Sequence, residues 1–578
     1  MIAGQVAAEG SPAMWDTRPV FLALLVLLFA ARGASQDTPL VAPGAVANNA
    51  SYRADGLPDA GVARGSMIAV FGQRLGPEAP AYAESLSLPT VLGGTQIQIQ
   101  AGGQVWTAPL LFSAANQVAA ILPSGVPAGD ATLTVRRDGA TSDPVAISVM
   151  DHAFGIFTRN QAGSGPAVVQ NWNSPGDQPV NAIINAAHPG QVMVLWGTGL
   201  GPIDGDDAGA PPVGNLPVAV EVWVGDRRAE VLYAGRSSGF PGIDQINFVV
   251  PDGVTGCYVP VVVIAGGVSS NYATIAVTKE GAVCSDPYGF MQADLETAVA
   301  KGELRTGVVA LNRLRAVLYQ GNDETPVNID SASGSFHSYH LSSLPATLGI
   351  RELIAPLGAC AAYGMRLNPN GEISTTPDDP LGGRQLRAGD QLTIEGTNGA
   401  KTIEWDGDYE GNLGGGMPGE EGAQPVFLTP GTYTLRGGAA GGDVGPFTAT
   451  IELTPGINWR NEAQVSEVRR DQDLTLMWTG GDASKEFVFI AGESVNKDDG
   501  VGGSFVCAAP VEAGRFTVPS RILRLLPSNS DSAASELPTG LLFLGTGSWS
   551  ARGRFSAPGL DGGYFGYWNQ RVRNVDFR

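Results

Sequence analysis

An internal repeat is the strongest constraint on what this chain can fold into. Residues 64–77 (RGSMIAVFGQRLGP) align with residues 189–202 (PGQVMVLWGTGLGP) at a constant offset of 125. Residues 116–123 (NQVAAILP) and 244–251 (DQINFVVP) follow in the same order at an offset of 128. Two blocks that recur in order at nearly one spacing predict two copies of the same domain.

The first repeated block has the pattern of a buried strand. Met67, Ala69 and Phe71 would lie on one face of this strand, with Ile68 and Val70 on the other. Because both faces are apolar, we expect the strand to be central in a two-sheet antiparallel β-sandwich.

Glycines follow that strand in both copies. We expect Gly72 and Gly76 to adopt backbone angles that other residues avoid, and Leu75 to fill the end of the sandwich. Trp196 and Leu200 would take the same roles in the second copy.

The composition fits several all-β domains. The 578 residues include 79 Gly and 40 Pro, and 43% of them are hydrophobic, which is typical of short strands joined by many turns. Domains usually contain about 100 to 200 residues, so we expect three to five. The formal net charge of -21 would repel a phosphate backbone, and we expect no nucleic acid partner.

The repeated pattern resembles the IPT/TIG class of immunoglobulin-like domains. The residues that carry the resemblance are Gly65 to Gly76 followed by Gln117 to Pro123, and again Gly190 to Gly201 followed by Gln245 to Pro251. The pair also resembles a family of exported proteins of acidobacterial type, over about residues 45 to 280. That resemblance implies tandem β-sandwiches and an extracellular setting, but it brings no established activity and no catalytic residues.

The chain after residue 285 is predicted to be mostly β. Met291, Leu295 and Val299 recur at helical spacing before Gly302, which predicts one short helix. Residues 308–319 suit either a strand or a helix, and we favour the strand. Further strand patterns lie at residues 391–395, 432–436, 447–453, 474–478 and 487–491.

A secretory signal is indicated at the N-terminus. An apolar run at residues 20–31 follows Arg18 and precedes the small residues 33–35, the order expected before a cleavage site. As a helix this run would span only about 18 Å of a hydrocarbon core of about 30 Å. We therefore expect an exported protein, secreted, held at the cell surface or periplasmic, with no permanent membrane span after cleavage.

These patterns predict five segments along the chain. They are a signal peptide (1–35), a first IPT/TIG-like sandwich (36–150), a second (151–284), a mixed, mostly β segment (285–385) and one or more C-terminal β-sandwich domains (386–578).

The cysteines are Cys257, Cys284, Cys360 and Cys507, and none has CxxC spacing. An even number in an exported chain favours disulfides over metal binding. We pair Cys257 with Cys284 because they bracket one strand-rich segment, which leaves Cys360 and Cys507 as the second pair. Free buried thiols are the alternative.

No motif meets the structural requirements of a catalytic or cofactor site. Residues 235–239 fit GxSxG, but Phe-Pro-Gly follows where a nucleophile elbow needs a helix, so we predict a turn. The glycines at 197–201 lack GxGxxG spacing and belong to the repeat. His337 and His340 are predicted on a strand, where residues three apart face opposite sides and do not share a metal ion.

Calcium is the ion that the acidic turns best fit. Asp406, Asp408 and Glu410 occupy positions 1, 3 and 5 of an EF-hand-like loop, but Met417 stands at position 12 in place of Glu. A second acidic turn contains Asp204, Asp206 and Asp207. Solvated turn carboxylates are the alternative interpretation of both groups.

Two functions are compatible with these patterns. The first is a non-catalytic binding, adhesion or scaffold protein that presents exposed aromatic residues to a glycan or protein partner. The candidate aromatic residues are Trp549, Tyr564, Tyr567 and Trp568, and the alternative for each of them is a place in the core. The second is a secreted polysaccharide hydrolase with paired carboxylates, or its carbohydrate-binding accessory. The sequence favours a binding function, because no catalytic motif meets its structural requirements. With 56 acidic residues, sequence spacing alone does not identify a catalytic pair of carboxylates.

Overall fold

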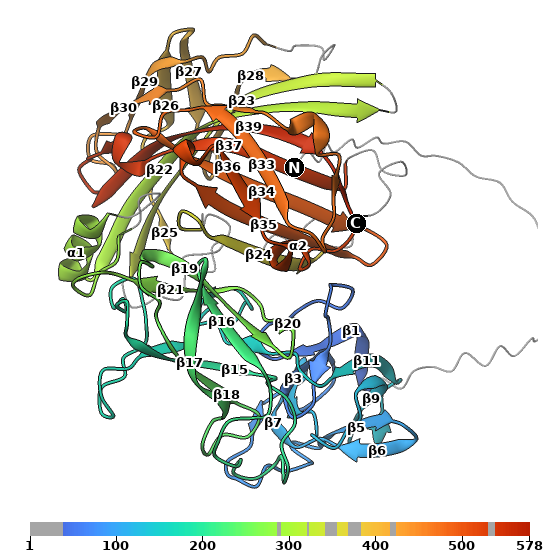
Figure 1. The fold of residues 1–578 in the computed structure, drawn as a ribbon. Coiled ribbons are helices and arrows are strands. Elements are labelled where there is room, and N and C mark those ends of the chain that lie inside the picture. Colours follow the sequence, from blue (N-terminus) through green and yellow to red (C-terminus); the bar gives the residue numbers. More distant parts are fainter. Residues whose placement is uncertain are drawn as a thin grey trace, which may run out of the picture.

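The computed structural model describes residues 38–285, 291–320, 323–340, 355–367, 383–416, 424–529 and 538–578. The expected signal peptide lies outside these residues. The described chain is almost entirely β, which confirms the predicted fold class, and it forms three packed β domains (Figure 1). None of the helices in the described part is both long enough and apolar enough to cross a membrane.

The first domain is a sandwich of two sheets. One sheet has the order β1 (Leu40–Asn48), β3 (Met67–Gln73), β8 (Gln117–Ile121), β7 (Leu110–Ser113) and β4 (Ala81–Tyr82). The other has the order β2 (Val62–Ala63), β11 (Val145–Met150), β9 (Gly129–Arg137), β5 (Thr95–Ala101) and β6 (Gln104–Thr107), with β10 (Ala140–Thr141) beside β9. Apolar residues from both sheets form a single core.

The second domain repeats this plan. Its strands follow the order β12 (Gly155–Ile156), β15 (Val192–Thr198), β18 (Asp244–Val249), β17 (Arg227–Arg236), β16 (Val220–Val224), β19 (Gly256–Ala265), β21 (Ala273–Val277) and β13 (Gly165–Pro166). Strands β14 (Val169–Asn171) and β20 (Val268–Ser269) pair with β15 and β19. Strand β17 joins the two layers, because its start pairs with β16 and its end with β18.

The sequence repeat corresponds to a repeat of strand register. Two pairs of neighbouring residues in the first domain have counterparts in the second at the offsets of 125 and 128. Met67 pairs with Ile121, and Val192 pairs with Val249 at the matching positions. Val62 pairs with Val149, and Ala187 pairs with Val277. The first is an antiparallel pairing in both copies and the second a parallel one. The two copies therefore share pairing as well as sequence.

The glycines after the repeated strand are required for a different reason from the one expected. Gly72 and Gly76 do not have left-handed backbone angles. A Cβ atom on Gly72 would lie 2.1 Å from the carbonyl oxygen of Leu40, and one on Gly76 would lie 2.3 Å from Ser113 Oγ. Close approach of neighbouring chain segments, rather than φ, excludes side chains here.

The residues predicted to close the ends of the sandwiches do so. Leu75 and Leu200 are both fully buried. Trp196 is partly buried and donates a hydrogen bond from Nε1 to Gln170 at 2.9 Å. Phe71 lies at the margin of the first domain, 37% exposed, although its strand is central in its sheet.

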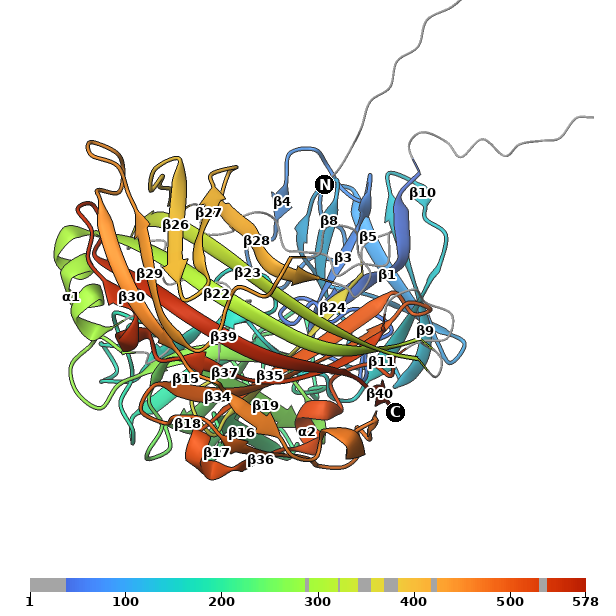
Figure 2. The same ribbon diagram turned by 90° about the horizontal axis from the view of Figure 1, so that it is seen from above.

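The third domain is built on a ten-stranded sheet (Figure 2). Its order is β24 (Cys360–Arg366), β35 (Val501–Ala509), β34 (Glu486–Asn496), β37 (Gly540–Ser548), β39 (Gly562–Asn574), β22 (Glu303–Gln320), β23 (Asp323–His340) and β25 (Arg384–Gln385). Strands β28 (Tyr409–Gly416) and β38 (Arg554–Phe555) pair with β23 and β39. Strands β22 and β39 run parallel, with Thr306 beside Gly562.

Smaller elements cover this sheet. A four-stranded sheet contains β27 (Gly399–Glu404), β26 (Gln391–Gly396), β29 (Gly431–Gly437) and β30 (Phe447–Leu453). A three-stranded sheet contains β31 (Ile457–Trp459), β33 (Leu474–Gly480) and β36 (Arg515–Val518), and β32 (Glu467–Val468) pairs with β40 (Asp576–Phe577). The helices are α1 (Gln292–Lys301), α2 (Ser520–Leu523) and short 3-10 turns at Glu462–Gln464, Val511–Ala513 and Ser550–Arg552.

The domain boundary expected at residue 385 falls inside this fold. Strands β22, β23 and β24 precede that position and β34, β35, β37 and β39 follow it, yet all of them belong to one sheet. The local predictions hold better: α1 ends at Gly302 in a left-handed conformation, and the predicted strands at 308–319 and beyond are present. Local pattern predicted the elements but not which of them pair.

Two disulfides are present, Cys257–Cys284 and Cys360–Cys507, and these are the pairs expected from the sequence. Cys257 and Cys284 pack with Leu295 of α1, so this disulfide lies where the second domain meets the third. Cys360 and Cys507 are direct partners in the pairing of β24 with β35.

A buried arginine joins the two repeated domains. Arg236 forms an ion pair with Asp244 and donates hydrogen bonds to the carbonyl oxygens of Gly65 in the first domain, at 2.7 Å, and Gly201 in the second, at 2.6 Å. Asp244 also accepts the N–H of Leu200 at 2.7 Å. Burial raises the pKa of the Asp244 carboxyl, while the charge of Arg236 and this N–H act against the rise.

We expect Arg236→Met to destabilise the N-terminal pair of domains by about 3 to 5 kcal/mol, because it leaves Asp244 buried and unpaired. Chemical denaturation of the full chain, following the transition of these domains, measures the effect. Arg64→Met is the control, since the half-buried Arg64 pairs with the exposed Asp151 and donates to the Ser124 carbonyl oxygen at 3.1 Å, so a loss of about 1 kcal/mol is expected. Equal losses in both variants would contradict a central role for Arg236.

Candidate binding site at the junction of the three domains

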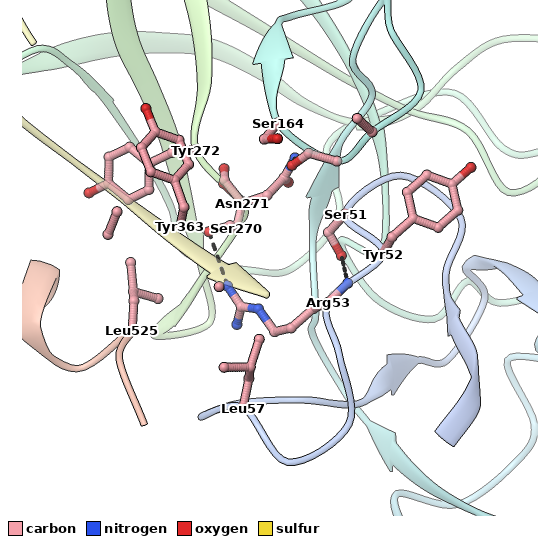
Figure 3. Close-up of a pocket in the computed structure, with 14 residues that line it drawn as sticks. Ser51, Tyr52, Arg53, Leu57, Ser164, Ser270, Asn271, Tyr272, Tyr363 and Leu525 are labelled. Atoms are coloured by element: carbon pink, nitrogen blue, oxygen red, sulfur yellow. Dashed lines mark hydrogen bonds between the residues drawn. The ribbon is translucent and has the colours of Figure 1, made fainter. Parts of the chain in front are cut away.

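A pocket of about 100 Å³ lies where the three domains meet (Figure 3). The first domain contributes residues 51–53 and Leu57, and the second contributes residues 162–164 and 270–272. Residues of β24 and Leu525 complete the pocket from the third domain. Each domain supplies one part of the wall, so the pocket exists only while all three are packed together.

Arg53 places a positive charge in this pocket. Its Nη2 atom donates to the carbonyl oxygens of Ser269 at 2.8 Å and Ser270 at 3.1 Å, and its Nη1 atom donates to that of Pro58 at 3.4 Å. No carboxylate of the described residues forms an ion pair with it. Burial lowers the pKa of Arg53, and the charge of Asp59 opposes this shift.

The loop that carries Arg53 is held by the side chain of Asn48. Asn48 Oδ1 accepts the N–H groups of Ala50 at 2.8 Å and Ser51 at 3.1 Å. Its Nδ2 donates to the carbonyl oxygens of Ala153 at 2.9 Å and Thr198 at 3.1 Å, both in the second domain. One buried amide therefore shapes the loop and ties it to the neighbouring domain.

The second domain's wall is fixed in a similar way. Asn271 Nδ2 donates to the carbonyl oxygens of Ile156 at 3.0 Å and Gly163 at 2.8 Å, while its Oδ1 accepts the Ile156 N–H at 2.7 Å. This amide is already used within the protein. Asn271 therefore positions the loop at residues 162–164 rather than offering free groups to a ligand.

Two tyrosines form an uncharged side of the pocket. Tyr272 is buried and Tyr363 is half-buried, and burial raises the pKa of both phenols. Both side chains are thus neutral at physiological pH. Figure 3 shows them beside β24, with Leu57 below the Arg53 guanidinium and Leu525 to the left of it.

A second pocket, of about 220 Å³, lies between the second and third domains. It is lined mainly by residues 253–259 and 356–359, and Asp226 is the carboxylate among its described lining residues. The pocket at the three-domain junction has no Asp, Glu or His among those residues. Neither pocket contains the pair of facing carboxylates that glycoside hydrolysis requires.

The GxSxG motif forms a turn, as predicted. Arg236 ends β17, and the N–H of Ser237 bonds to the carbonyl oxygen of Ile243 at 2.8 Å across the turn into β18. Ser237 is buried and no helix follows it. Sequence reasoning rejected this motif as a nucleophile elbow but missed that its arginine joins two domains.

The histidines are dispersed. His337 and His340 lie on β23, three residues apart and on opposite faces, as the strand prediction implied. His152 Nδ1 lies 2.7 Å from the carbonyl oxygen of Leu200, and His188 Nδ1 lies 3.1 Å from that of Thr278. Within the described residues, no group of three or more His, Cys, Asp or Glu side chains is placed to hold a metal ion.

The acidic turns have other partners. Asp207 accepts two hydrogen bonds from Ser124, from its N–H and its hydroxyl, each at 2.7 Å, and so links the two repeated domains. Asp206 accepts the N–H of Ala208 at 2.9 Å, while Asp204 is exposed. In the EF-hand-like segment Asp406 is exposed, and Asp408 and Glu410 flank the buried Tyr409 at the start of β28.

The aromatic residues proposed for ligand contact are part of the packed interior. Tyr564 and Tyr567 are buried, so the expectation that they are exposed is wrong. Trp549 and Trp568 are half-buried and pack on Phe487 with ring centroids 5.2 and 5.7 Å away. Tyr564, Tyr567 and Trp568 are covered because their strand, β39, lies inside the ten-stranded sheet.

Comparisons with known proteins do not assign a family. No family model and no curated protein match the chain. The solved structures it is similar to include a Salmonella alpha-2-macroglobulin mutant, with 10% identity and a TM-score of 0.15 over 93% of this chain but only 30% of that one. Immunoglobulin domains 1–4 of Sidekick-1 give 10% identity and a TM-score of 0.11, over 94% and 100% of the two chains.

A third similar structure is SGBP-B from the Bacteroides ovatus mixed-linkage glucan utilization locus, in complex with a mixed-linkage heptasaccharide. It is 8% identical, with a TM-score of 0.13 over 80% of this chain and 94% of that chain. Scores of this size do not define a common domain arrangement. The fold class therefore rests on the strands and sheets described above.

Asn48→Asp should loosen the loop that carries Arg53. The substitution keeps an acceptor for Ala50 and Ser51 but removes both donors to the second domain and places a charge beside their carbonyl oxygens. We expect a loss of about 2 to 4 kcal/mol in the free energy of unfolding. Asn116→Asp, at an exposed position of the same domain, is the control and should change it by about 0.5 kcal/mol or less. Denaturant titration of both variants makes the comparison.

We expect millimolar calcium to leave the melting temperature unchanged relative to chelator. Asp207 already accepts two hydrogen bonds, and neither acidic turn contributes to a group of three or more His, Cys, Asp or Glu side chains placed to hold a metal ion within the described residues. Asp207→Ala should lower the melting temperature equally with and without calcium. A rise of several degrees in calcium that Asp207→Ala abolishes would show that the turn binds the ion.

Proposed function

We propose that this chain is an exported, non-catalytic binding protein in which three packed β domains form a rigid scaffold around the junction pocket. The observation that carries this proposal is that all three domains contribute to one pocket whose loops are fixed by buried hydrogen bonds between domains. A pre-formed concave site with a few placed polar groups is typical of ligand binding. The lining residues offer neither a nucleophile with its base nor a carboxylate pair.

Export and family membership belong to the same proposal. Two disulfides fit an oxidising compartment, which supports a secreted, surface-held or periplasmic location. The shared strand register of the two N-terminal sandwiches supports an IPT/TIG-like pair, as the resemblance to exported proteins of acidobacterial type implies. In this proposal the repeated pair serves as scaffold and adhesion platform.

A glycan is the ligand that the pocket walls fit best. The half-buried Tyr363 offers an apolar ring surface of the kind on which sugar rings stack, and the serine hydroxyls nearby suit sugar hydroxyl groups. Tyr363 on β24 and the serines at positions 51 and 164 line the same pocket as Arg53 (Figure 3). This arrangement supports a polar, hydroxylated ligand of modest size.

Incubation of residues 36–578 with a panel of insoluble polysaccharides tests the proposal. We expect depletion of the protein from solution without release of reducing ends. Ser164→Trp, which fills the pocket, should abolish depletion, whereas Ser174→Trp, on an exposed turn of the same domain, should not. Release of reducing ends would identify an enzyme instead. An absence of depletion by every polysaccharide would contradict glycan binding.

A further inference from the structure

Arg53 is a partly buried cation in a chain of net charge -21, and no carboxylate of the described residues forms an ion pair with it, although the charge of Asp59 acts on it from farther away. A guanidinium has five N–H donors, and its three hydrogen bonds to carbonyl oxygens leave two. The buried Arg236 and the largely buried Arg313 are each paired with an aspartate. Arg53 has no such ion pair among the described residues, a property it shares with the partly buried Arg159, Arg315 and Arg470, and of these four arginines it is the one that lines the junction pocket.

We propose that the junction pocket binds the carboxylate of an acidic sugar residue, a uronic acid, through Arg53. This inference rests on the proposed binding function and specifies its ligand class. Removing a cation from water is costly unless an anion or hydrogen bonds replace the lost hydration. Carbonyl oxygens replace part of that hydration here, and a bound carboxylate would supply the missing negative charge.

The charge of the pocket selects a singly charged ligand. Arg53 is the one charged side chain among the described residues that line it, and the tyrosines opposite are neutral. A phosphate monoester, with up to two negative charges, would leave one of them uncompensated inside a strongly acidic protein. A planar carboxylate also matches the planar guanidinium better than a tetrahedral group does.

The shape of the pocket indicates where the rest of the sugar would lie. Tyr363 offers a neutral, half-buried ring, and Ser164 also lines the pocket (Figure 3). A sugar ring placed with its carboxylate on Arg53 would contact Tyr363 through its apolar face. Neutral sugars lack the group that the cation recognises, so they would bind more weakly.

Calorimetric titration of the mature chain with glucuronic and galacturonic acid oligosaccharides tests this inference, with the corresponding neutral oligosaccharides and a sulfated galactose oligosaccharide alongside. We expect the uronates to bind at least about tenfold more tightly than the neutral sugars. Their affinity should fall with added salt and below the pKa of the sugar carboxyl group. Equal affinity for neutral sugars, or tighter binding of the sulfated sugar, would overturn the inference.

Arg53→Gln should weaken uronate binding by about tenfold to a hundredfold, and Arg53→Lys, which keeps the charge but loses the planar donors, should have a smaller effect. Arg74→Gln is the matched control, because exposed Arg74 of the same domain also donates to a carbonyl oxygen, that of Thr38 at 2.9 Å. Melting curves check that each variant is folded. A folded Arg53→Gln variant that binds uronates as well as the parent would refute the role of Arg53.

The two proposals fail in different ways. Depletion by neutral polysaccharides that is unaffected by Arg53→Gln would leave the binding function standing and refute the acidic ligand. If neither the uronates nor any polysaccharide binds, both proposals are wrong.

Discussion

One buried cation determines how the two repeated domains sit against each other. Arg236 belongs to the second domain, but one of its hydrogen bonds ends on the Gly65 carbonyl oxygen of the first. Separating the domains would leave a guanidinium with fewer partners in a region that the fold still shields from water. A buried ion pair contributes little net stability by itself, but it strongly penalises arrangements that break its hydrogen bonds. The relative orientation of the sandwiches is thus specified by polar geometry as well as by apolar contact.

The junction pocket depends on this fixed orientation. Asn48 bonds to Ala153 and Thr198, which belong to the same end of the second domain as the Gly201 carbonyl that Arg236 contacts. The loop after Asn48 then carries Arg53 to the second domain's Ser269 and Ser270. A change in the angle between the first two domains would move Arg53 away from these carbonyl oxygens. The site is therefore a product of domain packing, and no single domain contains it.

The sequence predicted features that local pattern controls. Alternating apolar residues and glycine turns predicted the repeated strand of each sandwich, β3 and β15, and the repeat predicted the common fold of the two domains. Helix α1 was predicted from three apolar residues and a terminal glycine. The pairing of cysteines also matches, since few arrangements of four cysteines suit a strand-rich chain.

The sequence did not predict what arises only when distant segments meet. Arg236 occupies a turn-like motif and Arg53 a loop without pattern, so neither carries a local sign of burial. The aromatic residues of β39 looked available for binding because a glycine-rich terminal segment gives no indication of an interior strand. The sequence correctly indicated that position 72 requires glycine. The reason is the carbonyl oxygen of Leu40 on a neighbouring strand, which leaves no room for a side chain, and this contact is not visible in the local sequence.

The parallel pairing of β22 with β39 has a consequence for how the chain is made. Thr306 lies beside Gly562, so a central strand of the third domain lacks one neighbour until nearly the whole polypeptide has been synthesised. The two sandwiches before it contain all their own strands and can close earlier. The nascent third domain must meanwhile keep an apolar sheet edge away from other chains, and such edges are prone to intermolecular pairing. The risk of misassembly in the newborn protein is therefore concentrated in its last half.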